Sequence, residues 1–306
     1  MKMKLLSSLL LIIAMSAQAA EYKIFTPNSA ASGGSDTVAR RLSELYQKKT
    51  GNSLVVVNAP GGNHIVAVNA FKQESTHAIA AITPTSTMMV YNYLDNLPYQ
   101  DSDFDIVGEF GSSENIYFVN PRSGVNSPKD LVGRLAQSDK PFIGSHATSS
   151  LVNINALHKF LNAPVSAINY KNPSDVVLDV AAGNIDAGCV AAAAINLLIE
   201  MEQVGKIKII GTTANQPVRI NGHMVPSVSK DLKIVQYNNY VWLAITPGST
   251  PEHQRLARDL QELMQTAEMQ EVLASVAYHP SGRSSDQIIK TMRKSILENR
   301  DLAEIK

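Results

Sequence analysis

Short apolar runs rich in branched residues alternate with helical segments along the chain, and this order restricts the fold more than any other feature. A helix expected over residues 36–49 carries apolar side chains at helical spacing on one face. Buried strands are expected at residues 24–26, 54–57, 78–82 and 116–119. Strands and helices in this order predict an α/β fold with a mostly parallel sheet covered on both faces.

The same pattern starts again after Asn120-Pro121, which predicts a second α/β unit. Helices are expected at 149–161 and at 174–182, the latter capped by Gly183, and a turn at 247–251 places Thr250 as N-cap and Pro251 at the first helical position. Strands are expected to end at 143 and to cover 168–170, 187–190, 207–210 and 242–245. Three C-terminal helices are expected around Leu256–Leu263, Met269–Val276 and Ile288–Ile296. Two units predict two lobes with a ligand cleft between them.

The N-terminus has the three parts of a secretory signal peptide. Lys2 and Lys4 precede an apolar run from Leu5 to Met15, and an A-x-A pattern ends at Ala19. We predict cleavage after Ala19, so that residues 1–19 are a signal peptide and the mature protein is exported. A membrane anchor is the alternative, but the apolar run is shorter than a bilayer-spanning helix. Because no cysteine follows the cleavage site, a lipid anchor is not expected.

Charge and cysteine content exclude several classes of protein. Lys and Arg together number 27 and Asp and Glu 27, so no basic surface for nucleic acid is indicated, and no nucleic-acid partner is expected. The single cysteine, Cys189, excludes internal disulfides and lies in an apolar run typical of an inert core thiol. The 7 histidines are scattered and form no metal motif, so we expect neither a metal nor a cofactor.

Two loops between a strand and a helix are the candidate binding elements. The first covers residues 29–36 and the second residues 144–150; both crowd small and hydroxyl residues before a helix. A helix N-terminus offers free N–H groups and partial positive charge, which favour an anion. The alternative is that Ser35 or Asp36 and Ser149 merely cap their own helices. For Asp36 two interpretations stay open: a helix cap, or an acceptor for an amine or hydroxyl of a ligand.

Catalytic interpretations have less support. Ser145 stands next to His146, but no G-x-S-x-G elbow is present, and neighbours in a chain rarely point at one another. No Walker-type or G-x-G-x-x-G phosphate loop occurs. The chain is therefore not expected to be an enzyme.

Several motifs in order along the chain resemble those of Bug-type receptors, the periplasmic solute-binding components of tripartite tricarboxylate transporters (TctC-like). Residues 33–40 resemble G-G-x-[ST]-D-x-x-A-R, and residues 55–62 resemble V-V-x-N-x-P-G-A. Further similarity lies at Leu97-Pro98-Tyr99 with Asp103-Phe104, at Asn169-Tyr170-Lys171, at 182–186 and at 242–251. The similarity spans essentially all of residues 22–300.

This resemblance implies a two-lobed periplasmic binding-protein fold of type II, the Venus-flytrap fold, with a central ligand cleft. Lobe 1 would hold residues 20–120 and 241–306 and lobe 2 residues 121–240, with crossings near Pro121 and Val241. The two loops would clamp a carboxylate of the ligand, and the closed receptor would deliver the ligand to membrane permease subunits. Receptors of this shape are expected to act as monomers.

The expected site has two jaws and a floor. Neither loop contains an arginine, which favours a mono- or dicarboxylate carrying hydroxyl, amino or aromatic groups over a tricarboxylate. Small residues at 191–194 would replace polar ones found in the family. The expected ligand-binding residues are Ser29, Ser32, Gly33, Gly34, Ser35 and Asp36 in one jaw, Gly144, Ser145, His146, Thr148 and Ser149 in the other, and Thr83, Thr85 and Ser86 in the floor.

Two other functions remain alternatives at this stage. The same fold would serve a receptor that presents its ligand to a sensor kinase instead of a permease. An exported hydrolase built on Ser145 or Ser35 is the third alternative.

Overall fold

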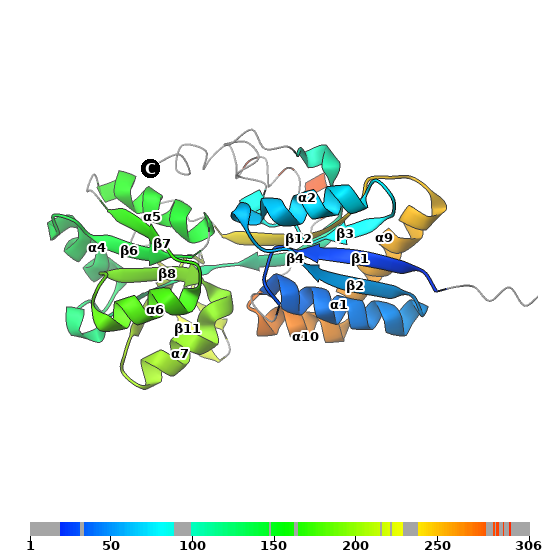
Figure 1. Ribbon diagram of the computed structural model, residues 1–306. Helices are drawn as coiled ribbons and strands as arrows, with labels where there is room; N and C mark the ends of the chain where they lie inside the picture. The colour runs from blue at the N-terminus through cyan, green and yellow to red at the C-terminus, as the bar shows by residue number, and fades with distance from the viewer. Residues whose placement is uncertain are drawn as a thin grey trace, which may run out of the picture.

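The computed structural model shows two lobes side by side, each built on a five-stranded sheet with helices on both faces (Figure 1). This arrangement confirms the expected two-lobed α/β fold. The structure describes residues 19–30, 34–88, 99–146, 148–161, 165–214, 216–220, 222–228 and 238–279, with residues 284, 286, 287, 290 and 294.

The first sheet has the strand order β2-β1-β3-β12-β4. Strand β1 is parallel to β2 and β3, whereas β12 is antiparallel to both β3 and β4. The strands are β1 (Glu21–Thr26), β2 (Ser53–Asn58), β3 (Ala80–Ile82), β4 (Asp105–Ser113) and β12 (Asn239–Ile245). The sheet is therefore mixed: β1, β2, β3 and β4 run in one direction, and β12 alone runs the opposite way because it returns from the second lobe.

Helices cover both faces of the first sheet (Figure 1). Helices α1 (Gly34–Thr50), α9 (Pro251–Met264) and α10 (Ala267–Ser275) share one core, in which Leu42 and Leu260 are fully buried. Helix α2 (Ile65–Glu74) packs on the other face, where Phe71 stacks on Phe104. Apolar residues at helical spacing explain both layers, since each helix needs one apolar face only.

The second sheet repeats this arrangement, with the order β7-β6-β8-β5-β9. Strand β6 is parallel to β7 and β8, and β5 is antiparallel to β8 and β9. Helices α4 (Pro128–Gln137) and α5 (Thr148–Leu161) contribute to one core, and α6 (Pro173–Ala182) and α7 (Ile195–Gln203) to the other. The strands are β5 (Asn115–Val119), β6 (Phe142–Ser145), β7 (Ser166–Asn169), β8 (Ala187–Ala191) and β9 (Lys208–Thr212), with a hairpin of β10 (Val218–Ile220) and β11 (His223–Val225) beside them.

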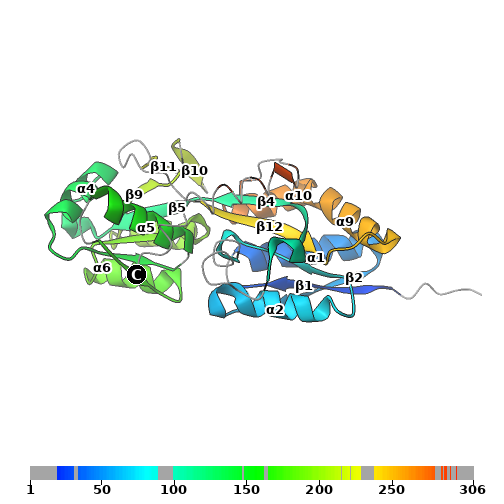
Figure 2. The ribbon, with the colours of Figure 1, turned by 90° about the horizontal axis from the view of Figure 1, so that it is seen from above.

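The chain passes into the second lobe at Glu114, the one residue between β4 and β5. Strands β4 and β12 extend side by side toward that lobe (Figure 2). The sequence pattern placed this crossing later, after residue 120, and put the strand at 116–119 in the first lobe. The structure differs because β5 pairs with β8 and β9, and Pro121 starts a short turn inside the second lobe. The return strand β12 belongs to the first sheet from Asn239 onward, close to the crossing expected near Val241.

Local sequence features explain most element ends. Thr250 caps α9 by accepting from the His253 backbone N–H, with Pro251 in the first turn, and Gly183 ends α6 at φ 84°, as both patterns predicted. Other elements differ from the sequence-based expectation. Strand β6 runs from Phe142 to Ser145, whereas the pattern predicted a strand that ends at Ile143. Strand β4, helices α2, α4 and α7 and the two strands β10 and β11 were not predicted. Of the third C-terminal helix, expected around Ile288–Ile296, only residues 290 and 294 are described, and both are helical. Within the part of the chain that is described, no helix has the length and hydropathy of a membrane span.

Candidate functional site

A cavity of about 750 Å³ lies between the two lobes and is lined by residues from both. This volume suits a small organic ligand. The first lobe contributes Pro27, Asn28, Ser29, Gly34, Ser35, Pro60, Gly61, Gly62, His64, Thr85, Thr87, Ser113, Asn239 and Tyr278. The second contributes His146, Leu151, Asn169, Tyr170, Lys171, Asn172, Ala191 and Ala193.

The cavity follows the carboxyl ends of the parallel strands in both sheets. Its lining comes from the segments after β1, β2 and β3 in the first lobe and after β6, β7 and β8 in the second. Ligands in open α/β sheets bind at this edge, where loops lead into helices. The two sheets place these edges against each other, so the cavity has two walls of similar construction.

Five of the predicted site residues line this cavity: Ser29, Gly34, Ser35, Thr85 and His146. They include members of both predicted loops, one from each lobe. Ser32 and Gly33, as well as the side chain of Thr148, lie outside the described residues, so their part in the site stays a prediction.

The remaining predicted residues lie behind the lining and hold it in place. Ser145 is 0% exposed, and its Oγ lies 3.4 Å from Oδ1 of the lining residue Asn169. Ser86 Oγ donates to Oδ1 of Asn239 at 3.0 Å, again supporting a lining side chain. Ser149, Thr83 and Gly144 are also buried. Ser149 Oγ donates to Asn115 Oδ1 at 3.0 Å; Thr83 continues the β1–β3 ladder through its N–H; and Gly144 leaves no room for a Cβ beside Val176.

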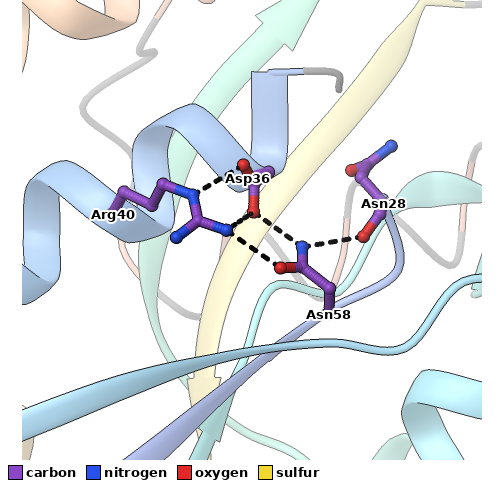
Figure 3. A network of polar contacts seen from close by, with 4 residues as sticks. All are labelled: Asn28, Asp36, Arg40 and Asn58. Carbon is purple, nitrogen blue, oxygen red and sulfur yellow. Dashed lines mark hydrogen bonds and ion pairs between the residues drawn. The ribbon is translucent and has the colours of Figure 1, made fainter. Parts of the chain in front are cut away.

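Asp36 lies in the first turn of α1. Through Asn58, its carboxylate joins this helix to the end of β2 and to the segment after β1 (Figure 3). Arg40 donates to both carboxylate oxygens, from Nε at 2.9 Å and from Nη2 at 3.0 Å. Asn58 Nδ2 donates to Oδ1 of Asp36 at 2.6 Å and to the Asn28 carbonyl at 2.9 Å. Asp36 is 1% exposed and does not line the cavity. Its carboxylate therefore fixes the loop before α1, and the acceptor role considered from the sequence has no support in this geometry.

The start of α1 depends on a close contact between Gly34 and Tyr278. A Cβ on Gly34 would lie 2.6 Å from both Cζ and the hydroxyl oxygen of Tyr278, so only glycine fits there. Burial raises the pKa of Tyr278 to about 12, with a hydrogen bond to Ser35 as an opposing contribution. Tyr278 is thus a neutral phenol in the cavity wall, in close contact with the first turn of α1.

Two histidines from opposite lobes reach the cavity, and both are neutral at pH 7. His64 follows Gly62 in a short turn before α2, with a left-handed φ of 74°, and its Nδ1 lies 2.8 Å from Oγ1 of Thr85. His146 follows β6, and its Nδ1 is buried without a hydrogen-bond partner among the described residues. Burial lowers the pKa of each ring to about 4. Each ring therefore offers one N–H donor and one lone pair.

Lys171 is the one charged side chain in the described lining, and no acidic residue lies there. Lys171 is exposed and has no ion pair with another described residue. Among the described residues, no group of three or more His, Cys, Asp or Glu side chains could hold a metal ion.

Lining residues from six further segments were not among the predicted ligand-binding residues. They are Pro60–Gly62 with His64, 169–172, Ala191 with Ala193 (expected at the site only as small residues), Ser113, Asn239 and Tyr278. The first three segments directly follow predicted strands, so extending the carboxyl-end rule to every strand would have found them. Tyr278 follows α10, far along the chain from the loop that it contacts, and no local pattern marks it.

These features define a two-lobed binding protein with its ligand site between the lobes. A sequence model of the tripartite tricarboxylate transporter family receptors, TctC, matches residues 38–304, and the chain belongs to this family of non-enzymatic solute-binding receptors. The hydrolase alternative is thereby set aside. The position of Ser145 is consistent with this conclusion, because its hydroxyl is buried beside the side-chain amide of Asn169. No curated protein matches the chain by sequence.

Solved structures share the whole fold at low sequence identity. A TctC solute-binding protein from Polaromonas is 17% identical with a TM-score of 0.71, over 94% of this chain and 99% of that one. MatC from Rhodopseudomonas palustris, solved with malate, is 15% identical with a TM-score of 0.72, over 93% and 99%. Another R. palustris protein, solved with adipate, is 17% identical with a TM-score of 0.76, over 93% and 96%. These similarities establish the type of fold for the chain.

Proposed function

We propose that this receptor captures a small organic mono- or dicarboxylate between its lobes and delivers it to the membrane permease subunits of a tripartite transporter. The observation that carries the proposal is the charge of the interlobe cavity. The first turn of α1, with Gly34 and Ser35, lines it together with Lys171, and no acidic side chain of the described residues does. A helix N-terminus and a lysine both favour an anion.

The relatives support the same ligand class. Malate and adipate, bound in the two R. palustris proteins, are both small dicarboxylates. Because these proteins are only 15% and 17% identical to this chain, the class of ligand is carried over here and not its identity.

Thermal unfolding of the purified protein against a panel of carboxylates tests the proposal. The panel holds unsubstituted, hydroxylated, amino and aromatic mono- and dicarboxylates, each paired with its uncharged amide. A carboxylate at about 100 times its dissociation constant adds roughly 2.7 kcal/mol of stability, which raises the midpoint by about 5–10 °C. We expect a rise with carboxylates and none with the matching amides. No rise with any carboxylate would contradict the proposed function.

Export and delivery form part of the proposal. We expect residues 1–19 to be removed and the monomeric mature protein, beginning at Ala20, to reside in the periplasm. Of the described residues, those within 20–113 and 238–279 then form the first lobe and those within 115–228 the second, with Glu114 between them. N-terminal sequencing of the protein from a periplasmic extract tests the cleavage site, and retention of Met1 would contradict it.

The permease is the expected partner because of the family to which the chain belongs. Closure on the ligand would bring the outer faces of both lobes into one docking surface, which a permease can distinguish from the open form. Uptake of labelled ligand by cells that carry the membrane subunits tests this step. Uptake that persists without the receptor would contradict delivery, and ligand-dependent binding to a sensor domain would favour the sensory alternative.

A further inference from the structure

The cavity has more uncharged hydrogen-bonding groups than a single carboxylate needs. Besides Lys171, its polar lining consists of hydroxyls, amides and the two imidazoles. One carboxylate placed at the first turn of α1 leaves the groups farther along the cavity for the rest of the ligand. Their chemistry therefore describes the part of the ligand that carries no carboxylate.

The first of these groups, His64, is held in an unfavourable backbone conformation. A left-handed φ of 74° is strained for a residue other than glycine. The bond between His64 Nδ1 and Thr85 Oγ1, at 2.8 Å, fixes the ring beside the cavity. The ring of His64 makes no other hydrogen bond to a described residue, so its Nε2 is the atom left for a ligand.

The second group, His146, has an unmet hydrogen-bonding requirement in the opposite wall. Its Nδ1 is buried, and the described part of the chain supplies no partner. Leaving a buried polar atom unpaired is unfavourable, and a ligand group bonding there would remove this cost. His64 and His146 thus line one cavity from two lobes, and each ring has a nitrogen without a partner among the described residues.

Two neutral imidazoles suit hydroxyl groups better than a second charge. A hydroxyl donates and accepts, as does a neutral imidazole, so either tautomer of each ring forms a bond. A second carboxylate between these rings would gain no ion pair from them. A ligand ammonium would need an acid, and Asp36, behind the first turn of α1, is engaged by Arg40 and Asn58.

We propose that His64 and His146 bind the hydroxyl groups of a polyhydroxylated monocarboxylate, such as an aldonic or uronic acid, and so determine the specificity of the receptor. This inference rests on the proposed function, since it assumes that a carboxylate occupies the cavity. It narrows the ligand class from any small mono- or dicarboxylate to a monocarboxylate with several hydroxyls.

Six-carbon probes separate the alternatives in calorimetric titrations of the purified protein. Gluconate and galacturonate carry one carboxylate and several hydroxyls, hexanoate carries one carboxylate alone, and adipate carries two. We expect at least one hydroxylated probe to bind more tightly than both hexanoate and adipate. Tighter binding of hexanoate, adipate or another panel carboxylate would overturn the inference and leave the proposed function standing. No binding of any carboxylate would overturn both.

Variants at the two histidines test their role directly. His64→Gly suits the left-handed backbone, and His146→Ala removes the other ring without adding bulk. Each is expected to weaken binding of the hydroxylated probe about tenfold, the value of one hydrogen bond, and to change hexanoate binding less than twofold. His77→Ala, at an exposed turn, is the control and should change neither. Unchanged affinity for the hydroxylated probe in both variants would overturn the inference. His64→Asn, which tolerates the same backbone and keeps a donor and an acceptor, should restore part of the affinity.

Discussion

The side-chain amide of Asn58 connects Asp36 to the opposite side of the loop, with Nδ2 2.6 Å from Oδ1 of Asp36 and 2.9 Å from the Asn28 carbonyl oxygen (Figure 3). Asn58 is the last residue of β2, and Asn28 follows β1. One amide thus ties together the ends of two parallel strands and the first turn of α1. The loop that reaches the cavity is thus fixed by the side chains of Asp36 and Asn58, neither of which lines the cavity.

Removal of the Asp36 carboxylate should loosen this loop. Asp36→Ala deletes two bonds from Arg40 and one from Asn58, and we expect a loss of about 2 kcal/mol of stability, or roughly 4–8 °C in the unfolding midpoint. Glu44→Ala, at an exposed acid on the same helix, is the control and should shift the midpoint by less than about 1 °C. Equal midpoints for the two variants would contradict the role given to Asp36.

A methyl group at Gly34 should disturb the site through Tyr278. Because the Cβ in Gly34→Ala would lie 2.6 Å from the ring, Tyr278 must move, and we expect lower stability together with weaker ligand binding. Gly133→Ala offers a matched control in α4, where no heavy atom lies within 4 Å of the added Cβ. That change should stabilise the protein by about 0.5–1 kcal/mol through helix propensity. A neutral Gly34→Ala in denaturant unfolding and in ligand titration would contradict the contact.

The two cavity histidines should make the free protein less stable in acid. Burial lowers the pKa of His64 and His146 from 6.5 to about 4, so the unfolded chain binds protons that the folded chain does not. The stability from these rings is present above pH 6.5 and is lost as the pH falls toward 4. In the double variant His64→Asn/His146→Asn, the unfolding midpoint should depend less on pH in this range. An unchanged pH profile would contradict the lowered pKa values.

The crossing between the lobes should respond to pH in the opposite sense. His279 pairs with β4 through its backbone, and its Nε2 lies 3.4 Å from Oε2 of Glu114, which raises the pKa of the ring. The stability from this pair is present below the unfolded pKa of 6.5 and is lost as the pH rises through the folded pKa. An NMR titration should give His279 a pKa above 6.5 that falls in Glu114→Gln. The same pKa in both proteins would contradict the ion pair.

Periodicity predicted the elements whose apolar residues follow one regular spacing. Helix α1 and strand β2 are examples, because Leu42 and Tyr46 repeat at helical spacing and 54–57 is a continuous branched run. Strand β4 was missed because Gly108 and Gly111 interrupt its apolar residues; at Gly111 the φ of 145° and the contact with the His279 backbone depend on glycine. That interaction joins residues far apart in the chain, and local sequence carries no trace of it.

The candidate site shows the same contrast between what local sequence predicts and what depends on contacts from distant segments. Ser29, Gly34, Ser35 and His146 were found because each stands between a strand and a helix, where strand ends meet. Ser145 and Ser149 have the same position in sequence, yet their hydroxyls turn to Asn169 and Asn115. Residue type and loop position therefore located the edge of the sheet, while the direction of each side chain depended on neighbours from other strands.

Filling the interlobe cavity tests the central claim, capture of a carboxylate between the lobes, most directly. Ala193 is exposed and lines the cavity, so Ala193→Trp should occupy the ligand space without disturbing the core, and Ala136→Trp on the exposed side of α4 is the matched control. The measurement is a calorimetric titration with the tightest-binding carboxylate of the panel. The account predicts one binding site in the wild-type protein and in Ala136→Trp, and none in Ala193→Trp. Equal binding by all three proteins would contradict it.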